Sequence, residues 1–478
     1  MYANLLWSLF LLLVAAVILR ILLRRHRSSS SRIAWITIVL ALPLLGVIAY
    51  FLLGEVNLGR RHARRMSRGS KALPPPDTLT GSVDDKPVDD EVMRSAHLFK
   101  LGQSISGFAV QAGNSAQLMG DSNSAIDAMV ADIDAAQDHV HVSFYIWLPD
   151  NNGRKVIEAL QRAAQRGVSC RALVDGLGSR SLIKSKHWKA MTKAGIHTAV
   201  ALPVKYPLLS PLVGRADLRN HRKIVIVDNA ITYCGSQNCA DPEFLVKARY
   251  APWVDILLRF EGPVVQQNQY LFATDWIEAC GENLSSLLQA STPHAGGFSA
   301  QVIGTGPSFR YSAMPEVFIA LLNTARREVL ISTPYYVPNE AMQDALCATA
   351  YRGVTTSLIL PARNDSLFVA AASRSCFEDL LEAGVRLYEF KSGLLHAKTF
   401  TLDGEVALIG SANMDRRSFD LNFENNILLH DAALTAAIVA RQRSYIEQSE
   451  RFTSDNLADW SLRQRLWNNT MAMLGPVL

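Results

Sequence analysis

Two long apolar runs stand at the start of the chain, and each predicts a helix that can cross a membrane. The first run covers residues 4–23 and contains one charge, Arg20, near its end. The second covers residues 33–53 and contains none. About 20 apolar residues in a helix span a hydrocarbon core of about 30 Å. Because only a short loop joins the runs, residues 1–66 are expected to form a transmembrane helical hairpin.

The charges of this region bear on its orientation. Residues 1–71 contain eleven Lys and Arg but one acid, Glu55, whereas residues 72–478 contain 37 basic and 42 acidic residues. Basic residues follow the first run, in the connecting loop, and also follow the second run. In a hairpin these two clusters lie on opposite sides of the membrane, so the positive-inside rule supports both orientations. The larger cluster after the second run favours a cytoplasmic body. No basic residue precedes the first run, which is atypical of a cleaved signal peptide.

Beyond residue 66 the pattern changes twice. Residues 67–94 hold three consecutive prolines and several aspartates with few apolar residues, which is typical of a linker. From residue 95 onward, short apolar runs alternate with helical segments. This alternation predicts an α/β fold with largely parallel sheets and flanking helices.

The alternating pattern occurs twice in the body. The strand-like run at residues 140–149 resembles the run at residues 329–338. Such a duplication predicts two similar α/β/α lobes, residues 95–290 and 291–478. An active site is expected at their interface, where each lobe contributes one half.

One charged motif occurs once in each lobe. It reads His-x-Lys-x4-Asp, and a Gly-Ser-x-Asn segment follows each copy at the same offset of 175 residues. The corresponding residues are His221, Lys223, Asp228, Ser236 and Asn238 in the first copy and His396, Lys398, Asp403, Ser411 and Asn413 in the second. Two copies in register on a duplicated frame indicate catalysis rather than surface charge pairs.

The spacing within the motif has a chemical reason. Side chains alternate along a strand, so a histidine and a lysine two residues apart point to one face. A nucleophile is thereby presented beside a phosphate-binding cation. Residues 224–227 are expected to form a buried strand, with Asp228 at its end. The hydroxyl, amide and backbone donors of the Gly-Ser-x-Asn segment suit phosphate oxygens.

The paired motifs resemble those of the phospholipase D superfamily. The N-terminal hairpin and the runs at residues 220–229 and 393–398 make the chain similar in particular to the bacterial cardiolipin synthases. The resemblance implies a multi-pass enzyme of the bacterial inner membrane that exchanges phosphodiesters through a covalent phosphohistidine, with no metal or other cofactor. The sequence agrees in lacking an H-E-x-x-H motif and a calcium loop.

The resemblance also implies roles for the site residues. One histidine attacks phosphorus and the other protonates the leaving alkoxide; His221 is preferred as nucleophile and His396 as acid, although the two motifs are nearly equivalent. The lysines neutralise phosphate charge, helped by the serines and asparagines. Asp255 and Glu424 follow the two histidines by 34 and 28 residues and resemble the acids that orient the rings. The catalytic motifs also include Asp228 and Asp403, which are expected to brace the motif loops or to bind a nearby donor.

The expected reaction converts two phosphatidylglycerol molecules into cardiolipin and glycerol. A membrane-bound phospholipase D that releases phosphatidate would use the same residues, and phosphatidylethanolamine could replace one substrate. The acidic body disfavours a nuclease or any nucleic-acid partner, and two intact motifs disfavour a non-catalytic lipid-binding scaffold. Anionic phospholipid, including cardiolipin itself, and the bilayer are the expected partners, while oligomeric state and acyl-chain preference stay open. Six cysteines without a C-x-x-C pair give no sign of a zinc site or a disulfide framework.

Overall fold

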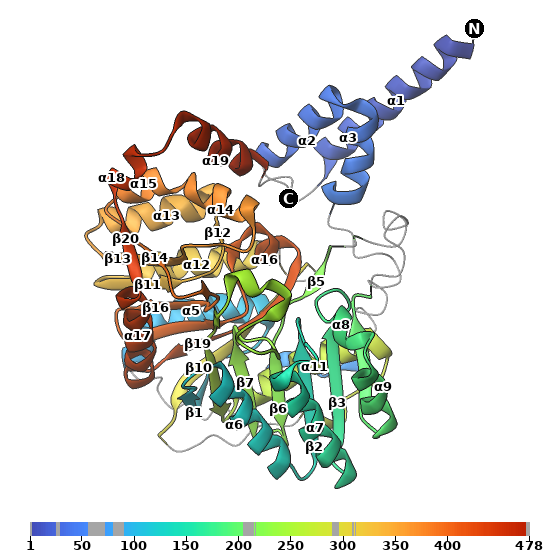
Figure 1. Cartoon of the computed structure of the whole chain (residues 1–478), viewed down its shortest axis with the longest axis vertical. Helices are drawn as coiled ribbons and strands as arrows, with labels where there is room; N and C mark the ends of the chain where they lie inside the picture. Colours follow the sequence, from blue (N-terminus) through green and yellow to red (C-terminus); the bar gives the residue numbers. More distant parts are fainter. Residues whose placement is uncertain are drawn as a thin grey trace.

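A helical unit at the N-terminus projects from a mixed α/β body in this computed structural model (Figure 1). The structure describes residues 2–24, 29–55, 72–79, 90–203, 215, 217–288, 296–307, 310 and 312–474. Most of the predicted linker, residues 67–94, lies outside these ranges, as does the boundary expected near residue 290. The body begins with α5 (Asp90–Ser106).

One sheet of sixteen strands forms the centre of the body, in the order β20-β14-β13-β11-β16-β17-β19-β10-β1-β9-β7-β6-β2-β3-β4, with β5 (Arg219–Asn220) beside β19. The strands of the N-terminal half are β1 (Gln111–Leu118), β2 (His139–Phe144), β3 (Ser169–Asp175), β4 (His197–Ala201), β6 (Ile224–Val227), β7 (Ile231–Gly235) and β9 (Leu257–Glu261). Those of the C-terminal half are β10 (Phe298–Thr305), β11 (Glu328–Ser332), β13 (Thr355–Pro361), β14 (Arg386–Phe390), β16 (Thr399–Leu402), β17 (Val406–Gly410), β19 (Asn422–His430) and β20 (Ser449–Phe452).

The two halves follow the same strand order outward from the antiparallel pair β1–β10. In each half three strands are parallel, namely β2, β3 and β4, and β11, β13 and β14. The motif strands β6 and β16 are antiparallel to both of their neighbours. The expectation of largely parallel sheets is therefore wrong. Tight turns such as Asp228-Asn229, both at positive φ, join these strands as hairpins, and hairpins make antiparallel pairs.

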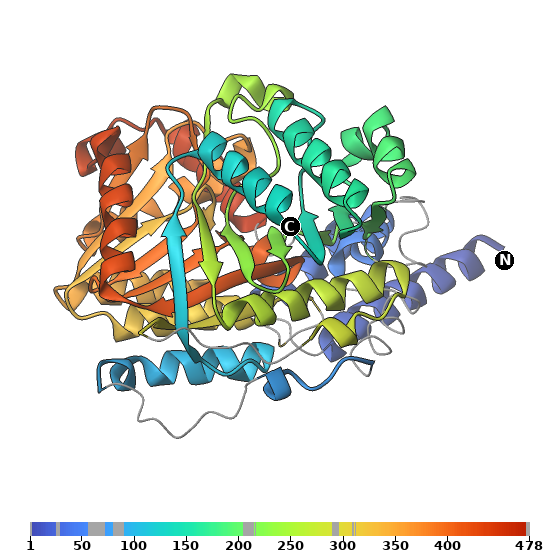
Figure 2. The ribbon, with the colours of Figure 1, turned by 90° about the horizontal axis from the view of Figure 1, so that it is seen from below.

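Helices cover both faces of the sheet. Figure 2 shows α6 (Ser122–Ala135) and α7 (Asn151–Gln165) on one face and α11 (Val264–Cys280) on the other. Further helices are α12 (Ala313–Thr324), α13 (Glu340–Tyr351), α14 (Leu367–Arg374), α17 (Ala432–Glu447) and α19 (Leu462–Leu474). A strand covered on both sides needs apolar residues throughout, which is why β6 reads Ile-Val-Ile-Val and is buried at all four positions.

The two apolar runs of the N-terminus differ in structure. The first forms one helix, α1 (Tyr2–Leu23), which is long and apolar enough to cross a membrane. The second, expected as a single span over residues 33–53, is divided into α2 (Ser29–Ala41), α3 (Pro43–Ala49) and the π-helical turn η1 (Tyr50–Gly54). Helix α2 ends where Leu42 leaves helical geometry, at φ −131° and ψ 69°, because Pro43 disfavours the helical conformation in the residue before it.

Candidate active site

Each motif histidine lies just before its motif strand, and the opposite half of the body fixes its backbone. The amide of His221 donates to the carbonyl of Phe423 at 2.9 Å, beside the parallel pair β5–β19. The amide of His396 donates to the carbonyl of Val254 at 2.8 Å, beside the pair formed by β8 (Trp253–Val254) and β15 (Leu394–Leu395). Neither histidine would be held in this way by its own half alone.

The ring of each histidine is held by a carboxylate that also belongs to the other half. Nδ1 of His221 lies 2.8 Å from Oε2 of Glu424, and Nδ1 of His396 lies 2.6 Å from Oδ1 of Asp255. The sequence order associates Asp255 with His221 and Glu424 with His396, and the structure exchanges these partners. The two acids are therefore at the site, as expected from the resemblance, but the site is assembled crosswise.

The electrostatics of these pairs fix the tautomer of the rings. Burial alone would raise the pKa of Asp255, but the charge and hydrogen bond of His396 lower it to about 2. The pKa of Glu424 is likewise lowered by His221 against the effect of burial. Both acids are thus ionised at neutral pH, so each Nδ1 carries the proton and donates it. Nε2 of each ring is then left with a free lone pair.

Burial lowers the pKa of both histidines. That of His221 falls to about 4, although Glu424 opposes the shift. The pKa of His396 is lowered by burial against the opposing charge of Asp255. A neutral imidazole with a free Nε2 is the form that can act as a nucleophile.

Two buried lysines accompany the histidines. Nζ of Lys223 donates to the carbonyl of His221, and Nζ of Lys398 to the carbonyl of His396, both at 2.7 Å. Burial lowers the pKa of Lys223 to about 8 and that of Lys398 to about 7. Each lysine also acts electrostatically on the histidine of the other motif, so the four side chains share one site.

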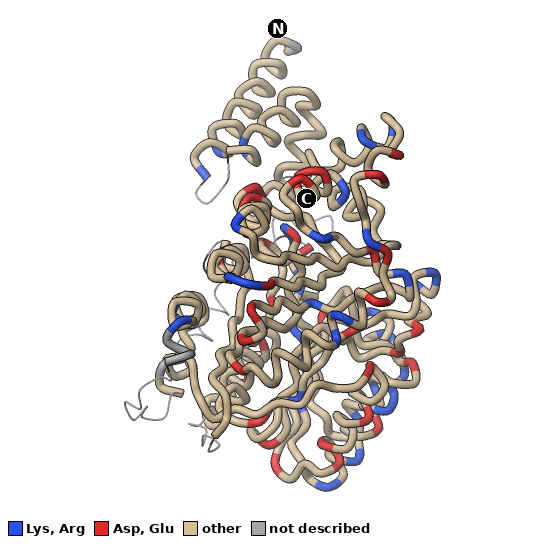
Figure 3. The backbone as a smooth tube through the Cα atoms, turned by 90° about the vertical axis from the view of Figure 1, so that its left-hand side faces the viewer, with Lys and Arg blue, Asp and Glu red and all other residues tan. Residues whose placement is uncertain are grey.

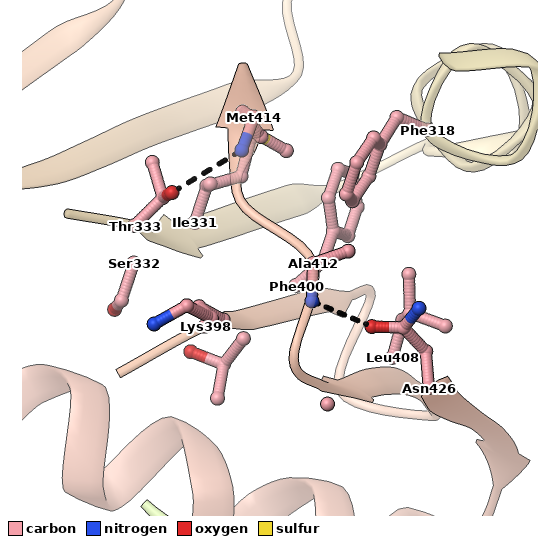
Figure 4. A pocket seen from close by; sticks show the side chains of 12 residues that line it. Phe318, Ile331, Ser332, Thr333, Lys398, Phe400, Leu408, Ala412, Met414 and Asn426 are labelled. Atoms are coloured by element: carbon pink, nitrogen blue, oxygen red, sulfur yellow. Dashed lines mark hydrogen bonds between the residues drawn. The ribbon is translucent and has the colours of Figure 1, made fainter. Parts of the chain in front are cut away.

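The surroundings of Lys398 explain its low pKa. It borders a pocket whose other lining residues include Phe318, Ile331 and Phe400 (Figure 4). Burial disfavours the ammonium ion, and the positive charge of Lys223 lowers the pKa of Lys398 further, against the opposing charge of Asp255. An anionic ligand beside the lysine would restore its positive charge.

The serines of the two motifs bind the acids, whereas the asparagines do not. Oγ of Ser236 donates to Asp255 at 2.6 Å, and Oγ of Ser411 donates to Glu424. These hydroxyls were expected to face phosphate, but they bind the carboxylates and so act through the histidines. Oδ1 of Asn238 accepts from the amide of Ile146 at 3.2 Å. Oδ1 of Asn413 is buried with no hydrogen-bond donor among the described residues.

The aspartates that end the motifs are not part of the site. Asp228 and Asp403 lie at the ends of β6 and β16 remote from the histidines. The carboxylate of Asp228 accepts from the amides of Gln137, Asp138 and His139, and that of Asp403 from the amides of Arg326, Arg327 and Glu328. Each of these carboxylates therefore fixes the loop that leads into β2 or β11 and does not contact a motif histidine among the described residues.

Two aromatic residues were not identified from the sequence. The ring of Tyr145 lies 4.8 Å from the ring of His221, and its centroid lies 5.6 Å from Nζ of Lys223. The ring of Trp253 lies 4.6 Å from the ring of His396. Tyr145 carried one signal, because it belongs to the strand-like run that recurs in the second half. Nothing in the sequence distinguished Trp253 from other buried tryptophans.

Comparison with known proteins agrees with this geometry. The sequence model of the family described as "Cardiolipin synthase, PLD-like domain" matches residues 129–276 and 318–446, and the phospholipase D-nuclease N-terminal family matches residues 9–55. Cardiolipin synthase A of Escherichia fergusonii is 37% identical, with 97% of this chain and 95% of that protein covered. Cardiolipin synthase A of Citrobacter koseri is 36% identical, with 98% and 96% covered.

A solved structure supports the fold. The crystal structure of phosphatidylserine synthase from Haemophilus influenzae superposes with a TM-score of 0.60 at 14% identity, covering 82% of this chain and all of that one. Sequence identity over nearly the whole length, two intact motifs and the shared fold lead to one assignment. The chain belongs to the bacterial cardiolipin synthases, membrane-associated phosphatidyltransferases of the phospholipase D superfamily.

Proposed function

We propose that this chain transfers the phosphatidyl group of one phosphatidylglycerol to the terminal hydroxyl of a second, which yields cardiolipin and glycerol. The observation that carries the proposal is the crosswise site. Two neutral histidines, each held by an ionised acid from the other half, flank two buried lysines. In this proposal residues 95–290 and 291–478 are two lobes that each supply half of the site.

In the proposed first step Nε2 of His221 attacks phosphorus, and the bond from phosphorus to the glycerol oxygen breaks. His396, protonated when the anionic phosphodiester lies beside it, gives its Nε2 proton to the departing oxygen, so that neutral glycerol leaves. Glu424 stabilises the positive charge that develops on His221. The product is a phosphatidyl-histidine.

The proposed second step reverses these roles. His396, now neutral, accepts the proton of the terminal hydroxyl of the second phosphatidylglycerol. The hydroxyl oxygen attacks phosphorus, the phosphorus–nitrogen bond breaks, and His221 is restored. Throughout both steps Lys223 and Lys398 neutralise the non-bridging phosphate oxygens, for which no metal or other cofactor is invoked.

The test uses the full-length enzyme in phosphatidylglycerol liposomes that contain a chelator, with the products resolved by mass spectrometry. The expected products are cardiolipin and glycerol in equal amounts. Phosphatidate without cardiolipin would mean that water is the acceptor and would replace this proposal with a hydrolytic phospholipase D. Activity only when phosphatidylethanolamine is added would assign that lipid as one of the two substrates.

The lysine pKa values predict how the rate depends on pH. Burial lowers the pKa of Lys398 to about 7 and that of Lys223 to about 8. Their positive charge is therefore present below pH 7 and is lost as the pH rises through 7 to 8. At the acid end His221, with a pKa of about 4, is protonated and loses its lone pair. The value of kcat/KM is expected to be highest between these limits, to fall about tenfold per pH unit between pH 7 and 8, and to fall more steeply above pH 8 where both lysines lose their charge.

The variant Lys398→Arg provides the control for this profile, because a guanidinium group stays charged throughout the range. Its alkaline fall is expected at a higher pH than in the wild type. A wild-type kcat/KM that still rises at pH 9 would contradict the assigned role of the lysines.

A further inference from the structure

The second apolar run of the N-terminus folds back on itself. The rings of Trp35 in α2 and Tyr50 in η1 lie 5.4 Å apart, whereas a continuous helix would separate residues 15 positions apart by about 22 Å. The turn permits close contact of the backbones, because a Cβ atom on Gly46 would lie 2.6 Å from the carbonyl oxygen of Ile38. Only glycine fits there. The segment therefore returns toward the end at which it began.

The beginning and the end of this folded-back segment meet the same end of α1. Arg20, in the last turn of α1, binds Glu55 with Nε at 2.5 Å and Nη2 at 2.8 Å. Arg24 adds a contact of 3.1 Å to the same carboxylate. Arg32, near the start of α2, donates to the carbonyl of Arg24 at 2.9 Å. The polar groups of the unit thus cluster where α1 ends and where η1 ends.

The helices of the two apolar segments differ in length. Helix α1 has 22 residues and is about 33 Å long, enough to cross a hydrocarbon core of about 30 Å, whereas α2 has 13 residues and is about 20 Å long. Helix α1 is packed against α2, α3 and η1 mainly through Val14, Val17 and Ile21, and its first half carries exposed leucines. Figures 1 and 3 show this half projecting away from the body, and its outer part bears no charged residue.

We propose that α1 crosses the bilayer, while α2, α3 and η1 form a re-entrant hairpin that enters and leaves the bilayer on the side of the catalytic body. The N-terminus and the body then lie on opposite sides of the membrane. A hairpin of two full spans would instead place them on the same side.

The distribution of charge in the sequence supports this path. All eleven Lys and Arg of residues 1–71 occur at position 20 or later. In a two-span hairpin they would be divided between the two sides of the membrane, against the positive-inside rule. A re-entrant segment leaves every one of them on the side of the body. That side is consequently the cytoplasmic one.

Contacts between the N-terminal helical unit and the body are consistent with the re-entrant path. Nη1 of Arg215 donates to the carbonyl of Leu53 at 2.6 Å, and its guanidinium also binds Asp217 at 2.5 Å. Asp217 in turn accepts a contact of 3.8 Å from Arg417. The chain runs from Asp217 through β5 directly to His221. The end of the re-entrant segment thereby contacts the stretch of the body that leads into β5 and His221, which places this stretch on the membrane side of the body in the proposed arrangement.

The experiment labels cysteines of the full-length protein in sealed spheroplasts with a membrane-impermeant maleimide. The native Cys280, which is exposed on the body, reports the position of the body, and the variant Tyr2→Cys reports the N-terminus. We expect the Tyr2→Cys protein to be labelled in sealed spheroplasts and the wild type to be labelled only after permeabilisation. The variant Cys280→Ser, which should lose the second signal, identifies the reporter.

Other labelling patterns would overturn the proposal. If neither protein is labelled until the membrane is opened, the N-terminus and the body share the cytoplasmic side, as in a two-span hairpin. If the wild type is labelled in sealed spheroplasts, the body lies outside. Cardiolipin synthesis by the Tyr2→Cys protein, measured in the same membranes, shows that the labelled molecules are folded.

Discussion

The variant His221→Ala is expected to lose cardiolipin synthesis by about 10⁴-fold or more, and His396→Ala by a similar factor. In the proposed mechanism one ring forms the bond to phosphorus and the other supplies and removes the proton of the alcohol. Both side chains are therefore needed for turnover of phosphatidylglycerol. The measurement is the rate of cardiolipin formation in phosphatidylglycerol liposomes. Residual activity of either variant near that of the wild type would exclude this mechanism.

A substrate with a better leaving group separates the two roles. A phosphatidyl ester of nitrophenol needs no acid, because nitrophenolate leaves unprotonated. His396→Ala is expected to release nitrophenolate once and to accumulate a phosphatidyl adduct on His221, detected by mass spectrometry of the intact protein. His221→Ala should form no adduct. The reverse outcome would exchange the two assignments, and Asp403→Asn, altered outside the site, is the control expected to retain both activities.

The variants Glu424→Gln and Asp255→Asn are expected to lower cardiolipin synthesis by about 10²- to 10⁴-fold, because an amide no longer fixes the ring tautomer as a carboxylate does. The crosswise pairing makes a sharper prediction. Glu424→Gln should impair adduct formation even from the nitrophenyl ester, since Glu424 holds His221. Asp255→Asn should form that adduct normally, since Asp255 holds His396.

Pairing within each half would give the opposite pattern, in which Asp255→Asn fails with the nitrophenyl ester. Double variants provide a second check. Adding Glu424→Gln to His221→Ala should cost little more, because residues that act as one unit are not additive. Melting temperatures of all variants, measured in the same detergent, separate loss of the site from loss of the fold.

The parts of the site that lie close together in the sequence could be predicted, and those that depend on long-range contacts could not. The spacing of His221 and Lys223, together with the repeat at an offset of 175 residues, is sufficient to predict the histidines and lysines of the candidate site, which the structure brings together. The partner of each histidine could not be derived, because Glu424 lies 203 residues from His221 and an equivalent acid occurs in each half. The spacing of residues within each motif does not predict that β19 lies beside β5.

Long-range contacts also decide the parts of the fold that the sequence did not predict. Alternation of apolar and helical segments correctly indicated an α/β body, but the strand direction around the motifs depends on tight turns such as that at Asp228. The apolar run of residues 33–53 is long enough for a span, and its hydropathy is the same whether the chain continues straight at Pro43 or turns back. Contacts such as that of Trp35 with Tyr50 decide between these paths, and they join residues whose proximity the hydropathy pattern does not encode.

If the crosswise acids act as proposed, they also determine when during synthesis the enzyme becomes active. His221 leaves the ribosome 203 residues before Glu424, which at about 5 to 20 residues per second is an interval of about 10 to 40 s. During this time the N-terminal helices are already available for insertion into the membrane. In the proposed mechanism, a nascent or truncated chain in the bilayer therefore lies among phosphatidylglycerol without a complete nucleophile. Such a chain would not form a phosphatidyl-histidine that it cannot resolve before the second half is made.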